Sequence, residues 1–200
     1  IGRQALYTQN FTSATDAYNV AVGYNAGFAI TTGTDNTIIG ALAGDAITTG
    51  SDNVAVGRSA LSASTTAANT TGDNNVAVGG NALYQITTAS DNTAVGAYAL
   101  DADTLGSRST AVGTAALSTQ NFTSATDTYN VAVGYDAGKT NTTGIKNTLI
   151  GSFSGDANTT GSQNTGVGIY SLSGNTVGDY NTAVGRRALL TNTGSDNNTA

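Results

Sequence analysis

The sequence predicts an all-β protein, a parallel β-roll or β-solenoid of stacked short coils, and three observations lead to this prediction. A motif of the form Asn-x-Ala-Val-Gly recurs along the whole chain. Its spacing stays close to one constant value. The composition is rich in Gly, Asn and Thr and contains neither Pro nor Glu, so it favours short strands and turns over helices.

The glycine of this motif marks one position in each coil. It falls at Gly2, Gly23, Gly40, Gly57, Gly79, Gly96, Gly113, Gly134, Gly151, Gly168 and Gly185. The steps between these glycines are 21, 17, 17, 22, 17, 17, 21, 17, 17 and 17 residues. Because a unit of this length is too short for two helices and long enough for short strands joined by turns, we expect about eleven coils of 17 residues.

The repeat also defines the domain organisation. The longer steps place inserted loops at 7–18, 62–74 and 118–129. The first and third loops share the residues 8–16 and 119–127 letter for letter. Because the repeat fills the chain and the sequence opens and closes partway through a unit, residues 1–200 are interpreted as a single repeat segment, an excerpt of a longer fibre.

Alternate positions of the motif predict the core. The residue before the motif glycine is Val or Ile, and the residue two earlier is Val or Thr. These β-branched residues share one strand face and are expected to form the core column. Ala or Ser followed by Leu or Gly, starting three residues after the glycine, predicts a second short strand. Because each coil brings few large apolar side chains, we expect several chains to associate and bury the Ala face and the Leu column.

Two polar columns are expected to stack from coil to coil. The first is the asparagine that opens the motif, because stacked amides can form a ladder and tolerate left-handed turns. It includes Asn36, Asn53, Asn75, Asn92, Asn147, Asn164 and Asn181. The second is the threonine four residues earlier, as in Thr32 and Thr49. Adjacent threonines should face opposite ways, which argues against a flat ice-binding surface.

These motifs carry a resemblance to two known groups of repeats. Residues 75–79 followed by Ala82 and Leu83, and the other registered copies, resemble the YadA-like head repeats of trimeric autotransporter adhesins. They are also similar to the Asn-Thr-Ala-Val-Gly repeats of phage tail fibres that end in an intramolecular chaperone domain. The resemblance implies a left-handed homotrimer that serves as a head or spacer of a surface fibre. The adhesin unit is shorter, so the turn in this chain is longer.

Charge and composition exclude several functions. The net charge is -6 with a pI near 4.1, and the basic residues are scattered, so neither nucleic acid nor an anionic membrane is an expected partner. There is no cysteine for a disulfide or a thiolate metal site, and no long apolar run that predicts a membrane span. No cofactor and no metal are expected.

The sequence offers little for catalysis. Without His, Cys or Glu, the available acid–base groups are Asp residues in turns rich in Gly, Ser and Thr. Asp35 and Asp52 recur on neighbouring coils and could form the carboxylate pair of a glycan hydrolase or oxygen ligands for a hard cation. The column continues as Asn74, Asp91 and Arg108, which is typical of solvated turn residues. The chain is therefore expected not to be an enzyme.

The inserted loops carry the candidate contact residues. Aromatic side chains on the loops of a rigid rod are suited to contact a sugar or a protein. The alternative is that the rings fold back over a neighbouring coil. The candidates are Tyr7, Phe11, Tyr18, Phe122 and Tyr129.

The function expected from these features is structural and adhesive. The chain is expected to be a segment of a homotrimeric extracellular fibre, on a virion tail or a bacterial surface, that gives reach and attaches to a glycan or protein receptor on a cell. The alternative is a subunit of a self-polymerising extracellular β-solenoid filament, because an unbroken solenoid has edges that template pairing.

Overall fold

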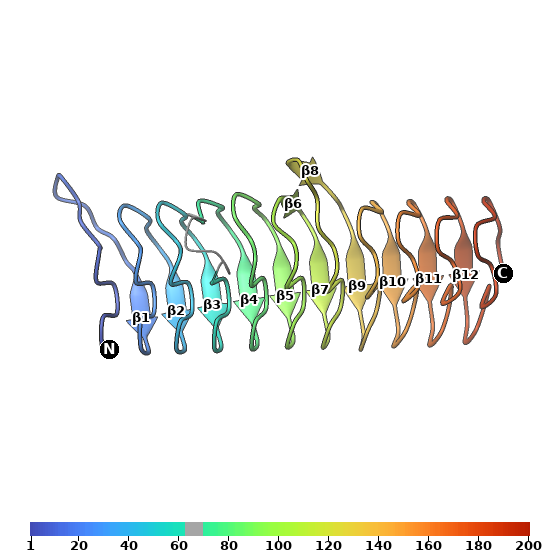
Figure 1. The fold of residues 1–200 in the computed structure, drawn as a ribbon, viewed down its shortest axis with the longest axis horizontal. Helices are drawn as coiled ribbons and strands as arrows, with labels where there is room; N and C mark the ends of the chain where they lie inside the picture. The colour runs from blue at the N-terminus through green and yellow to red at the C-terminus, as the bar shows by residue number, and fades with distance from the viewer. Residues whose placement is uncertain (63–69) are drawn as a thin grey trace.

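The computed structural model describes residues 1–62 and 70–200 and shows the predicted parallel β-solenoid (Figure 1). These described residues contain no helix. Ten strands form one parallel sheet along the rod. They are β1 (Val20–Val22), β2 (Thr37–Ile39), β3 (Val54–Val56), β4 (Val76–Val78), β5 (Thr93–Val95), β7 (Thr110–Val112), β9 (Val131–Val133), β10 (Thr148–Ile150), β11 (Thr165–Val167) and β12 (Thr182–Val184). A second, small sheet pairs β6 (Gly106–Ser107) with β8 (Thr126–Asp127).

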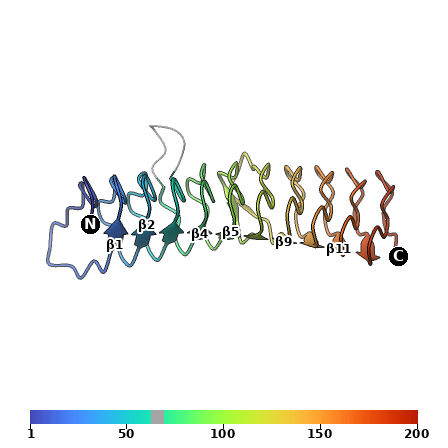
Figure 2. The same cartoon turned by 90° about the horizontal axis from the view of Figure 1, so that it is seen from below.

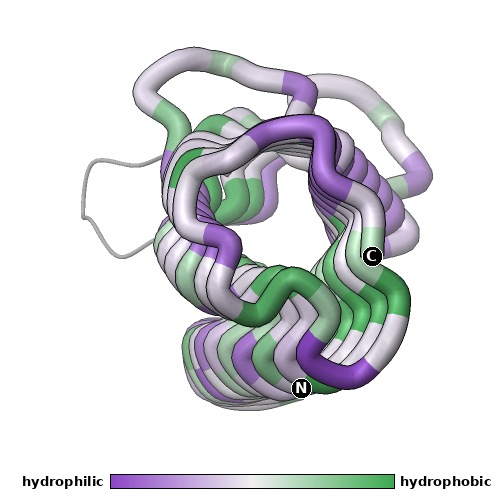
Figure 3. Tube along the Cα trace, turned by 90° about the vertical axis from the view of Figure 1, so that its right-hand side faces the viewer, coloured by the Kyte–Doolittle hydropathy of each residue, from purple (hydrophilic) through white to green (hydrophobic). Residues whose placement is uncertain are grey.

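Strands of successive coils pair in parallel with their motifs aligned. Ala55 of β3 lies beside Ala77 of β4, and Ala94 of β5 lies beside Ala111 of β7. The first of these steps contains an insertion and the second does not, so an insertion lengthens the connection and leaves the register intact. The coils follow one another as a regular rod in Figure 2. Seen along the rod in Figure 3, positions of similar hydropathy stack from coil to coil.

The inner and outer faces of the sheet are reversed relative to the sequence-based prediction. The middle residue of each strand is buried and the β-branched residues on either side lie outside; Ala55, for example, is buried between Val54 and Val56, which are partly exposed. The prediction that the β-branched residues form the core is therefore wrong. The prediction that the Ala and Leu columns need a partner chain is also wrong, because Leu61 and Leu83 are already buried within the single chain.

The volume inside a coil decides which residues face inward. The buried strand column holds Ala in most coils, and the facing wall usually supplies Leu four residues after the motif glycine. The coils of Ala21 and Ala132 carry Gly27 and Gly138 at this wall position instead, because Ile38 and Leu149 of the following coil reach it. Where the strand instead carries Ile38 or Leu149, the facing position is glycine. A methyl group on Gly44 would lie 3.0 Å from Ile38 Cδ1, and one on Gly155 would lie 2.6 Å from Leu149 Cδ2. A large residue on the strand thus takes the space that leucine fills elsewhere.

The wall that follows the motif glycine is built from turns, where a second short strand was predicted. After β3, Ala60 N–H donates to the Gly57 carbonyl (3.3 Å), and Leu61 N–H donates to the Ala82 carbonyl of the next coil (3.0 Å). Ser59 and Leu61 have φ values of 55° and 53°, the left-handed conformation found in tight turns. Such residues bend the chain sharply, which allows a short unit to close into a coil.

The motif asparagines lie inside the coil and form a ladder. The backbone N–H and the side-chain Nδ2 of Asn53 both donate to Oδ1 of Asn36, at 3.0 and 3.2 Å. The backbone bond recurs at Asn75, Asn92, Asn147, Asn164 and Asn181. Each buried amide therefore satisfies a backbone donor of the following coil, which a buried N–H group requires.

The threonine ladder is displaced by one residue from the predicted position. Thr31 Oγ1 donates to the Thr48 carbonyl (3.1 Å), and Thr48 Oγ1 donates to the Thr70 carbonyl (3.5 Å). Thr32 and Thr49, the residues predicted to form the ladder, are exposed. Adjacent residues of an extended chain face opposite ways, so only the first threonine of each pair turns toward the neighbouring coil.

Candidate functional site

The loop at 7–18 projects from the rod (Figure 1) and keeps two tyrosines at the surface. Tyr7 is 66% exposed and Tyr18 is 71% exposed. The Tyr7 ring stacks on Phe28, with 5.5 Å between ring centroids and 1° between ring planes. The Tyr18 hydroxyl donates to Asp16 (3.2 Å), and Phe11 is partly buried. Tyr7 and Tyr18 are therefore accessible to a partner.

The loop at 118–129 contains the same residues as 8–16 but buries its phenylalanine. Phe122 is only 7% exposed, which corrects its assignment as a surface contact. Thr104 of the preceding coil donates its hydroxyl to Asn121 Oδ1 (2.8 Å) and to the Phe122 carbonyl (3.2 Å), and β8 pairs with β6 of the same coil. Phe11 is only partly buried, so the two copies of the same segment differ in the burial of their phenylalanine.

The loop at 62–74 is described only at its two ends, because 63–69 lie outside the described residues. Ser62 Oγ donates to Asp45 Oδ1 (2.7 Å). Thr70 forms an isolated parallel bridge with Ile47, and Asp73 Oδ1 accepts a hydrogen bond from the backbone of the preceding coil (2.8 Å). Both ends of the insertion thus follow the pattern of the regular coils.

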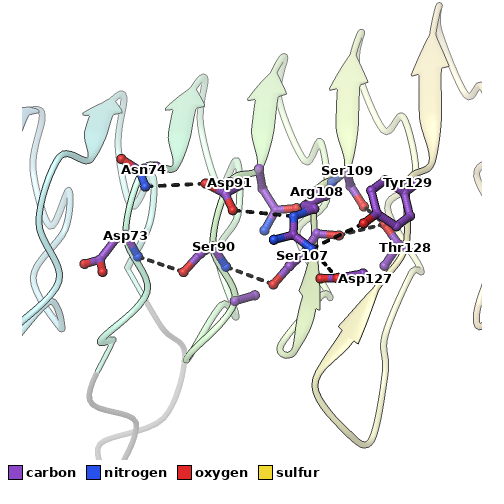
Figure 4. A network of polar contacts seen from close by, with 12 residues as sticks. Asp73, Asn74, Ser90, Asp91, Ser107, Arg108, Ser109, Asp127, Thr128 and Tyr129 are labelled. Carbon is purple, nitrogen blue, oxygen red and sulfur yellow. Dashed lines mark hydrogen bonds and ion pairs between the residues drawn. The ribbon is translucent and has the colours of Figure 1, made fainter.

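Tyr129 is 50% exposed and lies in a polar network on the surface, shown in Figure 4. Arg108 forms ion pairs with Asp127 and with Asp91, the latter at 3.8 Å. Its guanidinium lies 5.8 Å from the centroid of the Tyr129 ring and donates to the Tyr129 hydroxyl (3.3 Å). Exposed ion pairs add little to stability, but these contacts orient the ring. Tyr129 is therefore an exposed and positioned contact candidate.

A buried polar cluster occupies the coil where the asparagine ladder is interrupted by Ser109. Gln120 Nε2 donates to Asp103 Oδ2 (2.6 Å) and to Ser109 Oγ (2.8 Å), and Asn130 Nδ2 donates to Gln120 Oε1 (2.8 Å). Asp103 and Gln120 are at most 1% exposed. The longer glutamine side chain bridges the gap left by serine. Sequence reasoning missed this cluster, although the exception at Ser109 was its signal.

Burial raises the pKa of Asp103 to about 6, although hydrogen bonds from Gln120 and the backbone oppose the shift. The same interior column holds Ile86 one coil earlier and asparagines such as Asn141 and Asn158 further along. The folded state holds the proton of Asp103 more tightly than the unfolded chain does. The free energy of unfolding therefore falls as the pH rises from the pKa of Asp103 in the unfolded chain to its higher pKa in the folded protein. Above the folded-state pKa, the full decrease in the free energy of unfolding has taken place.

We expect Asp103→Asn to remove this pH dependence and to stabilise the protein at pH 7 by up to about 3 kcal/mol. The reason is that asparagine is neutral at every pH and already serves in the same column at Asn141 and Asn158. Denaturant unfolding of both proteins at pH 4 and pH 7 measures the effect. If the free energy of unfolding changes equally between pH 4 and pH 7 in the parent and the variant, the prediction is wrong. Asp103 would then titrate alike in the folded and unfolded states.

The outer face of the sheet carries two columns of β-branched side chains. The column beside the motif glycine consists of Val22, Ile39, Val56, Val78, Val95, Val112, Val133, Ile150, Val167 and Val184. The second column, two residues earlier, holds Val or Thr. Most inner residues of both columns are partly exposed. Ile39 and Ile150 are 41% and 39% exposed, and exposure is highest on the end strands, at Val20 (50%) and Val184 (62%). A continuous apolar strip on a monomer marks a candidate interaction surface.

An aromatic stack that sequence reasoning missed lies beside the glycine corner. Tyr135, Phe153 and Tyr170 come from three successive coils, with ring centroids 5.3 and 4.9 Å apart. Tyr135 lies one residue after its motif glycine, whereas Phe153 and Tyr170 lie two residues after theirs. The three aromatic residues therefore did not fall into one column of the repeat. The Phe153 and Tyr170 rings are parallel within 4° and cover each other's faces, which makes the stack a support for the corner.

The possible carboxylate pair, Asp35 and Asp52, lies at exposed corners of neighbouring coils. Both residues have a φ of 59°, the left-handed conformation in which turn Asp and Asn are common. Within 1–62 and 70–200, no three acidic, His or Cys side chains gather closely enough to hold a metal ion.

Comparison of the chain with protein-family models, curated proteins and solved structures gives no match. In the part of the chain that the structure describes, no helix is long and apolar enough to cross a membrane. What the structure defines is the class of the protein, a β-solenoid rod with one apolar sheet face exposed. The candidate functional surfaces are this face and the loop tyrosines Tyr7, Tyr18 and Tyr129.

Proposed function

We propose that this chain is a structural and adhesive segment of a homotrimeric extracellular fibre, in which it supplies reach and surface attachment. The observation that carries the proposal is the outer face of the sheet, where ten strands present rows of β-branched side chains to solvent. Removing apolar area from water is favourable by roughly 25 cal/mol per Å². Other chains that cover these rows would therefore stabilise the rod.

A copy of the same chain is the partner that suits this face. The rows run along the whole sheet with the spacing of the coils, and another copy offers rows of the same spacing and length. The Ala and Leu columns are buried within the chain, so the proposed interface is the sheet face alone. The number of three copies rests on the resemblance of the motif to the repeats of trimeric fibres.

The loop tyrosines support the adhesive part of the proposal. Tyr7 and Tyr18 are exposed on the loop at 7–18, and Tyr129 is exposed on the loop at 118–129. Aromatic rings contact sugars and protein surfaces through an apolar body and a polar hydroxyl. The proposed receptor is a glycan or a protein on a cell surface, and neither a catalytic residue nor a cofactor takes part.

We expect Val56→Lys combined with Val78→Lys to convert the trimer into a folded monomer. Two ammonium groups would enter an apolar interface without a partner, and burying an unpaired charge is strongly unfavourable. Analytical ultracentrifugation measures the mass, and circular dichroism measures the β content. Thr49→Lys is the matched control, because Thr49 is exposed on another wall of the coil; this variant should remain trimeric.

The mass of the parent chain distinguishes the trimer from its alternatives. A parent chain that stays monomeric over the whole concentration range contradicts the trimer. A mass that grows without limit with concentration supports the alternative, a self-polymerising filament.

Attachment is measured by binding the parent to arrays of glycans and of cell-surface proteins. Loss of binding in the double variant Tyr18→Ala with Tyr129→Ala supports the loop tyrosines as contact residues, and unchanged binding excludes them.

A further inference from the structure

The exposed sheet face has two edges, and every complete coil places one residue at each edge. At the first edge, each coil places the residue before the motif asparagine. At the second edge, it places the residue after the motif glycine. In the coil of β3 these residues are Asp52 and Arg58, which are exposed and lie at opposite ends of the strand. The ion pairs found among the described residues involve Arg108 and Lys139, so Asp52 and Arg58 have no oppositely charged partner in this part of the chain.

Rotational symmetry determines which edges would meet in an assembly of parallel rods. A rotation about an axis parallel to the rod moves no residue along that axis, so coils of equal number stay at equal height. When the sheet faces of the copies point toward the axis, the first edge of one copy adjoins the second edge of its neighbour. Each coil therefore meets the opposite edge of the same coil in the next copy.

One coil carries opposite charges at its two edges. Asp52 has Arg58 at the opposite edge, and in no coil of the sequence do the two edges carry the same charge. The coil of β12 places a ring and a cation at its edges, Tyr180 and Arg186. A cation and an aromatic ring attract each other. A shift by one coil in either direction leaves Asp52 opposite Ala41 or Gly80 and so separates it from its cation, while one of the two shifts sets Asp35 beside Arg58.

We propose that the edges of the sheet form a seam between copies of this chain, in which Asp52 of one copy pairs with Arg58 of the next. This inference rests on the proposed trimer and adds the feature that sets its axial register. The apolar rows are nearly the same in every coil, so they allow neighbouring rods to slide. The edge residues differ from coil to coil, and charged groups at the rim of an interface are suited to fix register.

Charge exchange at one coil tests the seam. Asp52→Arg and Arg58→Asp should each weaken the trimer at least about ten-fold in its dissociation constant, because like charges then face each other at every interface. The double variant Asp52→Arg with Arg58→Asp restores opposite charges and should recover the parent constant. Arginine is compatible with the left-handed corner of Asp52, since Arg108 occupies the same column with a φ of 64°.

The matched control is Asp16→Arg with Arg58→Asp, which has the same net charge as the exchange variant but changes an exposed aspartate in the loop at 7–18. It should remain as weak as Arg58→Asp alone. Sedimentation measures the dissociation constants, and circular dichroism verifies the fold of each variant. A monomeric parent overturns the proposed function and the seam together. A trimeric parent whose exchange variant shows no recovery, or recovers no better than the control, overturns the seam alone.

Discussion

Replacing Gly96 with alanine is expected to lower the free energy of unfolding by roughly 4 kcal/mol, through backbone strain and steric overlap. Gly96 has a φ of 136°, and a Cβ at this position would lie 2.4 Å from the carbonyl oxygen of Gly113 in the next coil. The obstacle is backbone, which cannot move aside without separating two coils. The same close approach recurs along the motif glycines, so each one sets the distance to the coil that follows.

Substitutions at two other glycines distinguish backbone strain from steric overlap. Gly185→Ala retains the positive φ of 129°, but no atom lies within 4 Å of its Cβ position; it should show the strain alone, about 1–3 kcal/mol. Gly80 has an open Cβ position and an ordinary φ, so Gly80→Ala should change stability little. Denaturant unfolding followed by circular dichroism compares the three variants. Equal stability of the Gly96 and Gly80 variants would contradict the role of the motif glycine in coil stacking.

The stacking of the coils could be predicted from the sequence, whereas the direction in which the strands face could not. The constant spacing of the motif leaves only one register that aligns every copy. Val and Ala differ mainly in size, and the usual preference places the larger apolar residue inside. Here the facing wall fills the narrow interior, so only a small strand residue such as Ala55 fits. The paired occurrence of Ile38 with Gly44 was the signal of this volume limit.

The candidate site was only partly predictable, because identical residues meet different neighbours. The segments 8–16 and 119–127 have the same sequence, yet Phe122 is buried beside a preceding coil and Phe11 is not. Local sequence cannot distinguish these environments. The Asp103–Gln120 contact likewise depends on a coil-to-coil neighbour. The exposed apolar face was missed for a different reason: its residues had been placed in the core.

Leu149→Ala is expected to lower the free energy of unfolding by about 4 kcal/mol, because it removes a buried side chain that no neighbour can replace. Leu149 is 1% exposed. Its methyl groups approach the Cβ positions of Gly138 and Gly155, at 2.9 and 2.6 Å. With alanine on the strand and glycine on the wall of both coils, the interior keeps a cavity. Denaturant unfolding measures the loss.

The wall residues provide the rescue that identifies the cause. Adding Gly138→Leu and Gly155→Leu to Leu149→Ala rebuilds the arrangement of Ala111 with Leu117, and should recover most of the lost stability. Leucine accepts the left-handed backbone of these positions, since Leu117 has a φ of 50° where Gly138 and Gly155 have 59° and 56°. Gly155→Leu alone should destabilise the protein by overpacking against Leu149. A triple variant no more stable than Leu149→Ala would mean that volume exchange across the coil does not govern this core.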